Sequence, residues 1–135
     1  MTESYSDHEF LVLRPEVAVA VIKDGAVLLD LETKYFYSVN STGWAIIRLF
    51  ERGTTLEQVR TQCRVWSGGS VGNHDLEVFL ATIFKEHLVV AGQTDVSQDP
   101  EPPENGWSTP RIEKYSKPLQ RIMTSAFDPS IPLAE

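Results

Sequence analysis

Few residues in this 135-residue sequence have the chemistry of an active site. The three histidines, His8, His74 and His87, are scattered along the chain, and Cys63 is the single cysteine. A structural or catalytic zinc site needs several nitrogen or sulfur ligands at characteristic spacing, and these residues do not supply it. The sequence therefore predicts neither a metal site nor a cofactor.

The other reactive groups have plainer interpretations. The glycines of SGGSVG, residues 67–72, lack the lysine and the following serine or threonine of a phosphate-binding loop. Cys63 falls on an apolar helical stripe, which favours a buried, inert thiol over a nucleophile. Asp30 and Glu32 share a strand face, where we expect two solvated carboxylates. We predict no catalytic residue and expect that the protein is not an enzyme.

Composition and charge exclude further classes of protein. Hydrophobic residues make up 41% of the chain and charged residues 23%, as in an ordinary globular domain. A net charge of −7 disfavours binding to nucleic-acid phosphates. No apolar run reaches the roughly 18 residues of a membrane helix. The polar N-terminus is unlike a secretory signal, and a single cysteine fits a cytoplasmic protein.

Three short strands are predicted before residue 40. The segment 17–23, VAVAVIK, is rich in β-branched residues, which favour strands. Asp24-Gly25 follows it and is a strong hairpin signal, because a type I′ turn needs positive φ at both central residues. The segments 26–32 and 35–40 supply two more strands on either side of a second turn. This pattern predicts a three-stranded antiparallel meander.

Three helices are predicted after the meander. Residues 40–42, NST, offer three possible N-caps for a helix that ends before Gly53. Thr54 with Glu57 forms the capping-box pattern of a second helix. Apolar residues at helical spacing across 76–84 indicate a third. The fold class is therefore α+β, winged-helix-like, with a three-stranded antiparallel β-meander followed by three helices.

The composition changes sharply after this region. Residues 95–106 are rich in proline and acidic side chains and cannot bury enough apolar surface to order themselves. We expect a folded domain over residues 1–94, a disordered acidic linker over 95–106, and a tail over 107–135 in which apolar residues return. A flexible linker of this length spans about 20 Å, so the tail can reach back to the domain.

Two stretches of the sequence also resemble a known family. They are DGAVLLDLETKYFYSVNSTGWAIIRLFERGTTLEQV, residues 24–59, and DLEVFLATIFKEHLVV, residues 75–90. Together they are similar to the PqqD family (pyrroloquinoline quinone biosynthesis protein D-like), the peptide-recognition domain of ribosomal-peptide modification pathways. The resemblance covers about residues 11–92. Family members often carry glycine at the positions of Lys34 and His87, so we expect positive φ at both.

The resemblance implies a RiPP recognition element, a non-catalytic peptide-binding adaptor that acts as a peptide chaperone. In such domains a precursor (leader) peptide pairs with the free edge of the third strand and inserts apolar side chains against the third helix. An edge strand offers unpaired N–H and C=O groups for this β-strand addition. The peptide-binding residues carried over to this sequence are Tyr35, Phe36, Tyr37, Ser38, Val39, Leu76, Phe79, Leu80 and Ile83.

The same resemblance implies two partners, a ribosomally made precursor peptide and its modifying enzyme, such as a radical SAM enzyme or a cyclase. The protein itself would be a monomer or a weak dimer. Strand alternation places Tyr35, Tyr37 and Val39 on one face and Phe36 and Ser38 on the other. It leaves open which face is outward.

The tail carries a pattern of its own, W-x2-P-x-I-x2-Y-x2-P-L followed by AFDP. This pattern resembles apolar–proline motifs in the leaders of ribosomally made peptides and C-terminal extensions of some PqqD-like proteins. Three uses remain open: folding back on the chain's own groove, docking on a partner enzyme, and serving as a substrate-like segment. The residues of this predicted docking motif are Trp107, Pro110, Ile112, Tyr115, Leu119 and Phe127.

A winged-helix nucleic-acid-binding regulator is the alternative function, because the order of strands and helices also allows it. A helix that reads a DNA groove would be expected to carry several Arg, Lys, Asn or Gln side chains. The predicted third helix instead carries Asp75, Glu77 and Glu86 against the single Lys85. The charge pattern favours the peptide-binding adaptor.

Overall fold

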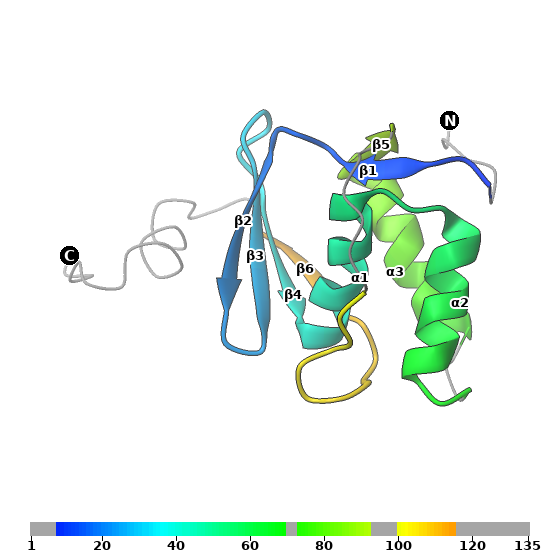
Figure 1. Cartoon of the computed structure of the whole chain (residues 1–135). Coiled ribbons are helices and arrows are strands. Elements are labelled where there is room, and N and C mark those ends of the chain that lie inside the picture. Colours follow the sequence, from blue (N-terminus) through cyan, green and yellow to red (C-terminus); the bar gives the residue numbers. More distant parts are fainter. Residues whose placement is uncertain (1–7, 70–72, 93–99, 116–135) are drawn as a thin grey trace.

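The computed structural model describes residues 8–69, 73–92 and 100–115 (Figure 1). The described part of the chain contains six strands and three helices. The strands are β1 (Leu11–Leu13), β2 (Val17–Ile22), β3 (Gly25–Asp30), β4 (Phe36–Asn40), β5 (Val89–Ala91) and β6 (Ile112–Tyr115). The helices are α1 (Ser41–Arg52), α2 (Leu56–Trp66) and α3 (Asn73–Lys85).

The predicted α+β fold class, an antiparallel meander followed by three helices, is confirmed. Strands β2, β3 and β4 pair antiparallel in sequence order. The two turn residues between β2 and β3 are Lys23 and Asp24, one position earlier than the predicted Asp24-Gly25, and Asp24 has a φ of 66°. Two features were not predicted: β6 extends the meander to the order β2-β3-β4-β6, and β1 pairs with β5 in a separate two-stranded sheet.

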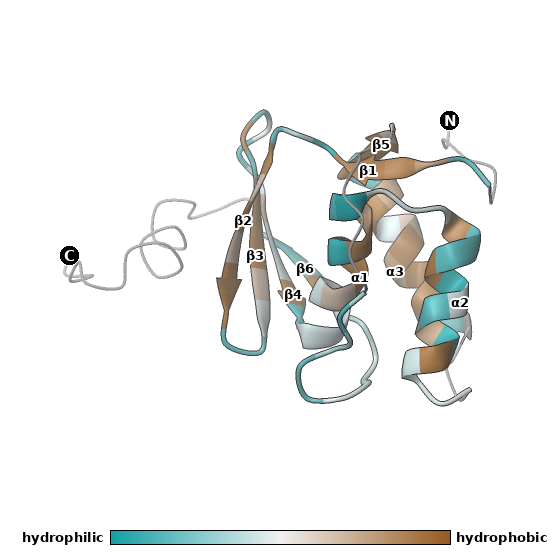
Figure 2. Ribbon diagram, viewed as in Figure 1, coloured by the Kyte–Doolittle hydropathy of each residue, from teal (hydrophilic) through white to brown (hydrophobic). Residues whose placement is uncertain are grey.

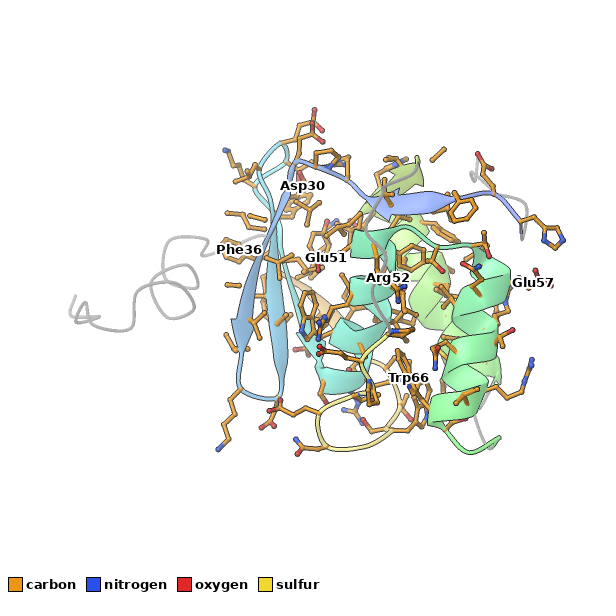
Figure 3. The ribbon with its side chains drawn as sticks, in the orientation of Figure 1. Asp30, Phe36, Glu51, Arg52, Glu57 and Trp66 are labelled. Carbon is orange, nitrogen blue, oxygen red and sulfur yellow. The ribbon has the colours of Figure 1, made fainter. Side chains whose placement is uncertain are left out.

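The helices cover one face of the four-stranded sheet, with α1 next to the strands (Figure 1). Apolar residues predominate in β1, β2 and β3, and apolar and polar stretches alternate along α2 (Figure 2). Tyr37 and Val39 lie in the main core beneath the helices. Phe36 belongs to a second cluster on the side of the sheet away from the helices (Figure 3). Alternation along β4 therefore turns Tyr37 and Val39 inward.

Local signals account for the helix starts with one correction. Asn40 caps α1, and its side chain accepts a hydrogen bond from the Gly43 N–H. The predicted capping box of α2 is wrong by one residue, because Thr55 and Gln58 form it instead. Thr54 is engaged elsewhere, since its backbone N–H and C=O pair with Leu11 of β1. The helix N-cap is therefore Thr55, and Thr54 instead pairs with β1.

Positive φ at the two positions where family members often carry glycine is confirmed. Lys34 has a φ of 71° and His87 a φ of 58°. Each residue lies in the turn that follows a regular element. The Lys34 N–H donates to the Asp30 carbonyl after β3, and the His87 N–H donates to the Phe84 carbonyl after α3. The chain therefore keeps the backbone path of the turns without their glycines.

Asp30 differs from the expectation of a solvated carboxylate. Its side chain is 1% exposed and forms an ion pair with Arg14 at 2.5 Å. The same carboxylate accepts hydrogen bonds from the N–H groups of Glu32 and Thr33. Burial raises the pKa of Asp30, but these bonds and the Arg14 charge outweigh it and hold the pKa below its ordinary value. The carboxylate organises the turn after β3.

Residues 100–106 contact the folded core at several points. Pro103 is buried, Glu101 pairs with Arg48 of α1, and Asn105 donates a hydrogen bond to Asp24 in the β2–β3 turn. Composition alone does not reveal such contacts, because each uses a partner far away in the sequence. Residues 95–99 of the proposed linker lie outside the described residues, and the domain division at residue 94 stays a proposal.

Candidate functional site

The outer edge of β4 is occupied by a segment from the C-terminal part of the same chain. Strand β6 pairs antiparallel with β4, with Ile112 opposite Val39 and Tyr115 opposite Phe36. Just before β6, the Asn40 N–H donates to the Arg111 carbonyl at 3.3 Å. We call residues 107–115 the resident segment. It lies along the edge that the sequence predicts for an added strand.

Asn40 fixes the start of this pairing. Its Oδ1 accepts from the backbone N–H of Gly43 at 2.9 Å and of Arg111 at 3.0 Å. Its Nδ2 donates to the Thr109 carbonyl at 2.8 Å. One side chain therefore caps α1 and holds the backbone of the resident segment at the same time.

The first turn of α1 provides a second anchor. The Thr42 hydroxyl is buried and accepts a hydrogen bond from the Ser108 N–H at 3.0 Å. A Cβ atom at Gly43 would lie 3.0 Å from the Arg111 carbonyl oxygen and 3.1 Å from a Phe79 ring carbon. Glycine thus lets the resident segment approach the helix closely.

A groove separates the resident segment from α3. Phe79, Val78 and Thr82 line it from the helix, and the stretch 109–113 lines it from the other side. Ile112 packs against the main core from within the segment, as does Trp107. The arrangement is an extended chain held by backbone pairing on one side and by apolar contacts with a helix on the other.

The far end of β6 meets a small polar cluster. Lys114 Nζ lies 2.9 Å from Glu86 Oε1 and 4.2 Å from the centre of the Tyr35 ring. The Tyr37 hydroxyl donates to the same Glu86 oxygen at 2.9 Å. Burial raises the pKa of Glu86, but the bonds from Lys114 and Tyr37 outweigh it and leave the pKa below its ordinary value. Burial and the neighbouring carboxylate both raise the pKa of Tyr37, so its hydroxyl stays a donor.

The structure distributes the predicted peptide-binding residues over four environments. Phe36 faces the second apolar cluster, whereas Tyr35 contacts Lys114. Ser38 pairs with Glu113 in the β4–β6 ladder. The remaining members are buried in the main core, where Phe79 also borders the groove: Tyr37, Val39, Leu76, Phe79, Leu80 and Ile83. Their proposed contact with a separate peptide stays a prediction.

The predicted docking motif is described only in part. Trp107 and Ile112 pack against the main core, Pro110 is buried, and Tyr115 packs against the second cluster. Leu119 and Phe127 lie outside the described residues. The part that is described lies on the chain's own β4 edge, so it is placed in cis.

Sequence reasoning missed several residues that shape this edge: Asn40 as a strand anchor, Thr42, Gly43, Glu86 and Lys114. Asn40 was identified only as a helix cap, and its second role depends on a partner 71 residues away. Alternation in RIEKY, residues 111–115, would have placed Ile112 and Lys114 on one face. Nothing in the local pattern pairs Lys114 with Glu86.

Cys63 and the possible metal ligands can be placed within the described residues. Burial raises the pKa of the Cys63 thiol to about 12, and Cys63 lies in the main core. Within residues 8–69, 73–92 and 100–115, no three His, Cys, Asp or Glu side chains are grouped to hold a metal ion. No described helix is long and apolar enough to cross a membrane.

Comparison with known proteins gives one structural likeness. No family model matches the chain, and no curated protein matches it. A solved structure, TbiB1 in complex with the TbiA(beta) leader peptide, is 28% identical and covers 62% of this chain and 99% of that chain, with a TM-score of 0.49.

Proposed function

We propose that this chain is a non-catalytic, PqqD-like adaptor that binds a precursor (leader) peptide by β-strand addition and presents it to a maturation enzyme. The observation that carries the proposal is the antiparallel pairing of β4 with β6. An edge that accepts one extended segment from far along the chain has the geometry to accept another. The resemblance of residues 24–59 and 75–90 to PqqD-like proteins points to the same edge.

In this proposal the backbone and the side chains of the bound peptide make different contributions to binding. Backbone pairing along β4 supplies affinity that any extended peptide can use, and the groove against α3 supplies selectivity. The groove lies beside Phe79, which belongs to the buried core and so offers a rigid wall. A bound peptide would present alternate side chains to that wall, as the resident segment does with Ile112.

Occupation of the edge by the chain itself adds a condition to this function. A precursor peptide reaches β4 only when the resident segment leaves it. The W-x2-P-x-I pattern of that segment is similar to leader motifs, which supports a leader-like occupant that the true ligand replaces. The partner enzyme, a radical SAM enzyme or a cyclase, belongs to the proposal as the receiver of the bound peptide.

A disulfide between β4 and β6 tests the proposal. Val39 and Ile112 are directly opposite each other, and opposed Cβ atoms in an antiparallel pair lie about 4.5–5.5 Å apart, close to disulfide geometry. Replacing both by cysteine in the full chain should lock the resident segment in place when oxidised. The buried thiol of Cys63 should not compete.

The ligand in this test is the labelled leader of a short precursor peptide encoded beside the gene, titrated by fluorescence anisotropy. We expect binding to the reduced double variant and none to the oxidised one, whereas the Val39→Cys single variant should bind under both conditions. Equal binding to both redox forms would show that the peptide does not use the β4 edge. No binding at about tens of micromolar, together with DNA retained on a gel, would overturn the adaptor in favour of the nucleic-acid regulator.

A further inference from the structure

The resident segment presents two side chains to the interior side of the site. Ile112 lies opposite Val39 and Lys114 lies opposite Tyr37, and both of those β4 residues point into the main core. Glu113, between them, lies opposite Ser38 and faces the other side of the sheet. The site therefore receives an apolar side chain and, two residues later, a basic one.

The basic side chain is 40% exposed and lies against a cluster of polar and aromatic groups. Glu86, Tyr37 and Tyr35 surround Lys114, and we call these three residues the cation subsite. The Glu86 side chain is only 15% exposed, and the Tyr37 residue is 1% exposed. The ammonium group thus has a carboxylate on one side and a ring face 4.2 Å away on the other.

Release of the resident segment would change the environment of Glu86. Its carboxylate would keep the hydrogen bond from the neutral Tyr37 hydroxyl but would lose the bond from Lys114. Lys85 would still attract the carboxylate. A partly buried charge that loses a hydrogen-bonded ion pair is destabilised, so an incoming strand without a cation at this position binds less favourably. A strand with a cation there restores the pair.

We propose that the peptide recognised at the β4 edge carries a lysine or arginine two residues after an apolar residue, and that the cation subsite selects it. This inference rests on the proposed function, because it names the class of peptide that the same edge would take. The apolar residue occupies the position of Ile112, and the basic residue that of Lys114. The side chain between them is free to vary, since it faces away from α3.

The test needs a full-length chain whose own β6 has lost its two core-facing side chains. The double variant Ile112→Asp, Lys114→Glu changes only residues of β6 and leaves the accepting surface intact. Hydrogen exchange should show loss of protection over residues 112–115, with the meander still protected. The probes are labelled nonapeptides, WSTPRIEKY, which copies the resident segment, and WSTPRIEEY, in which its lysine is replaced by glutamate.

We expect this double variant to bind WSTPRIEKY at least about tenfold more tightly than WSTPRIEEY, because a hydrogen-bonded ion pair is formed in one case only. Adding Glu86→Lys to the same chain should reverse the preference. The matched control is WSTPRIKKY, in which the outward-facing residue changes charge. Its affinity should stay within about threefold of that of WSTPRIEKY, since exposed ion pairs contribute little.

Each other outcome has a distinct meaning. Equal binding of the lysine and glutamate peptides, or a preference that survives Glu86→Lys, would overturn the cation subsite while leaving strand addition in place. Binding of neither peptide to the released edge would instead contradict the proposed function itself. A gain in affinity for the control peptide as large as the loss for WSTPRIEEY would show that net peptide charge, and not this subsite, decides affinity.

Discussion

The edges of β2 and β4 offer the same backbone chemistry but have different occupants. No strand among the described residues pairs with the outer edge of β2, whereas β6 covers β4. Val21 near the end of β2 is 65% exposed, and Val39 on β4 is 3% exposed. Unpaired N–H and C=O groups are available at any edge strand, so they do not explain why β6 pairs with β4 and not with β2.

The difference lies in the layer next to each edge. Beside β4, Asn40 and Thr42 hold the backbone of an added chain, and α3 provides a wall for its side chains. Beside Val21, residues of α1 and of the loop 101–104 line a pocket, and no strand pairs with the β2 edge within the described residues. An edge becomes a binding site when neighbouring elements supply both anchors and a groove.

The largest expected effect comes from truncating Phe79, which lines the groove between α3 and the resident segment. Phe79 is 2% exposed, and Phe79→Ala should lower the free energy of unfolding by about 3–5 kcal/mol because it leaves a cavity in the core. Denaturant titration measures this loss. Val78→Ala is the control, since Val78 lies on the same helix but is 50% exposed. Similar losses of stability in both variants would mean that Phe79 contributes no more to the core than the exposed Val78 does.

Closing the space at Gly43 should release the resident segment. Gly43→Val places a branched side chain where a Cβ alone would be 3.0 Å from the Arg111 carbonyl oxygen. We expect the docking of the segment to weaken by about 1–3 kcal/mol through overpacking, measured by hydrogen exchange over residues 112–115. The amides of β2 serve as an internal control and should keep their protection. Unchanged exchange in β6 would show that the segment does not need this close approach.

Loss of the Tyr37 hydroxyl tests the cation subsite within the intact chain. Tyr37→Phe removes the hydrogen bond to Glu86, and we expect about 1 kcal/mol of destabilisation by denaturant titration. Tyr115→Phe removes a hydroxyl that contacts Glu113 at an exposed position and should cost much less. Equal losses of stability in the two variants would show that the Tyr37–Glu86 hydrogen bond contributes no more than the exposed Tyr115–Glu113 one.

Acid should weaken the β4 side through Glu86. Its pKa in the folded protein lies below the ordinary value of 4.5, so its contribution to stability is complete above that value and is lost as pH falls through the folded pKa. Lys114 and Tyr37 hydrogen-bond this carboxylate, and Lys85 attracts it. Thermal unfolding followed from pH 7 to about pH 3 should show a smaller decline in Glu86→Gln than in the parent chain. Parallel declines would exclude Glu86 as the cause.

The smallest effect is expected at the unoccupied edge. Val21→Thr alters an exposed side chain on β2 and should change stability by less than about 0.5 kcal/mol and leave β6 protected. Val39→Thr makes the same chemical change on β4, where the hydroxyl would be buried, and should cost clearly more. Denaturant titration compares the two. A large effect at Val21 would indicate that the β2 edge also has a partner.

The sequence was sufficient to predict the elements whose conformation depends on neighbouring residues. Asp24-Gly25 identified the hairpin because the turn depends on the φ preferences of two adjacent residues. The three helices followed from periodic apolar residues and caps. Positive φ at Lys34 and His87 followed from the family resemblance, and both angles are present.

The parts that depend on distant partners could not be predicted in the same way. Strands β1 and β5 have three residues each, too short for a recognisable pattern, and they pair across most of the domain. Asp30 was expected in solvent with Glu32 because no local signal in the sequence pairs it with Arg14, which precedes the meander. The anchoring role of Asn40 likewise appears only when Thr109 and Arg111 reach it.

The covalent connection between the domain and the resident segment has a quantitative consequence. A tethered strand faces its own edge at an effective concentration on the order of millimolar, and a free peptide must compete against that value. The apparent dissociation constant of a free peptide is its intrinsic constant divided by the fraction of molecules with an empty edge. Each contact of Asn40 and Thr42 with residues 108–111 lowers that fraction. These hydrogen bonds therefore set the concentration at which a free peptide begins to displace the resident segment from β4.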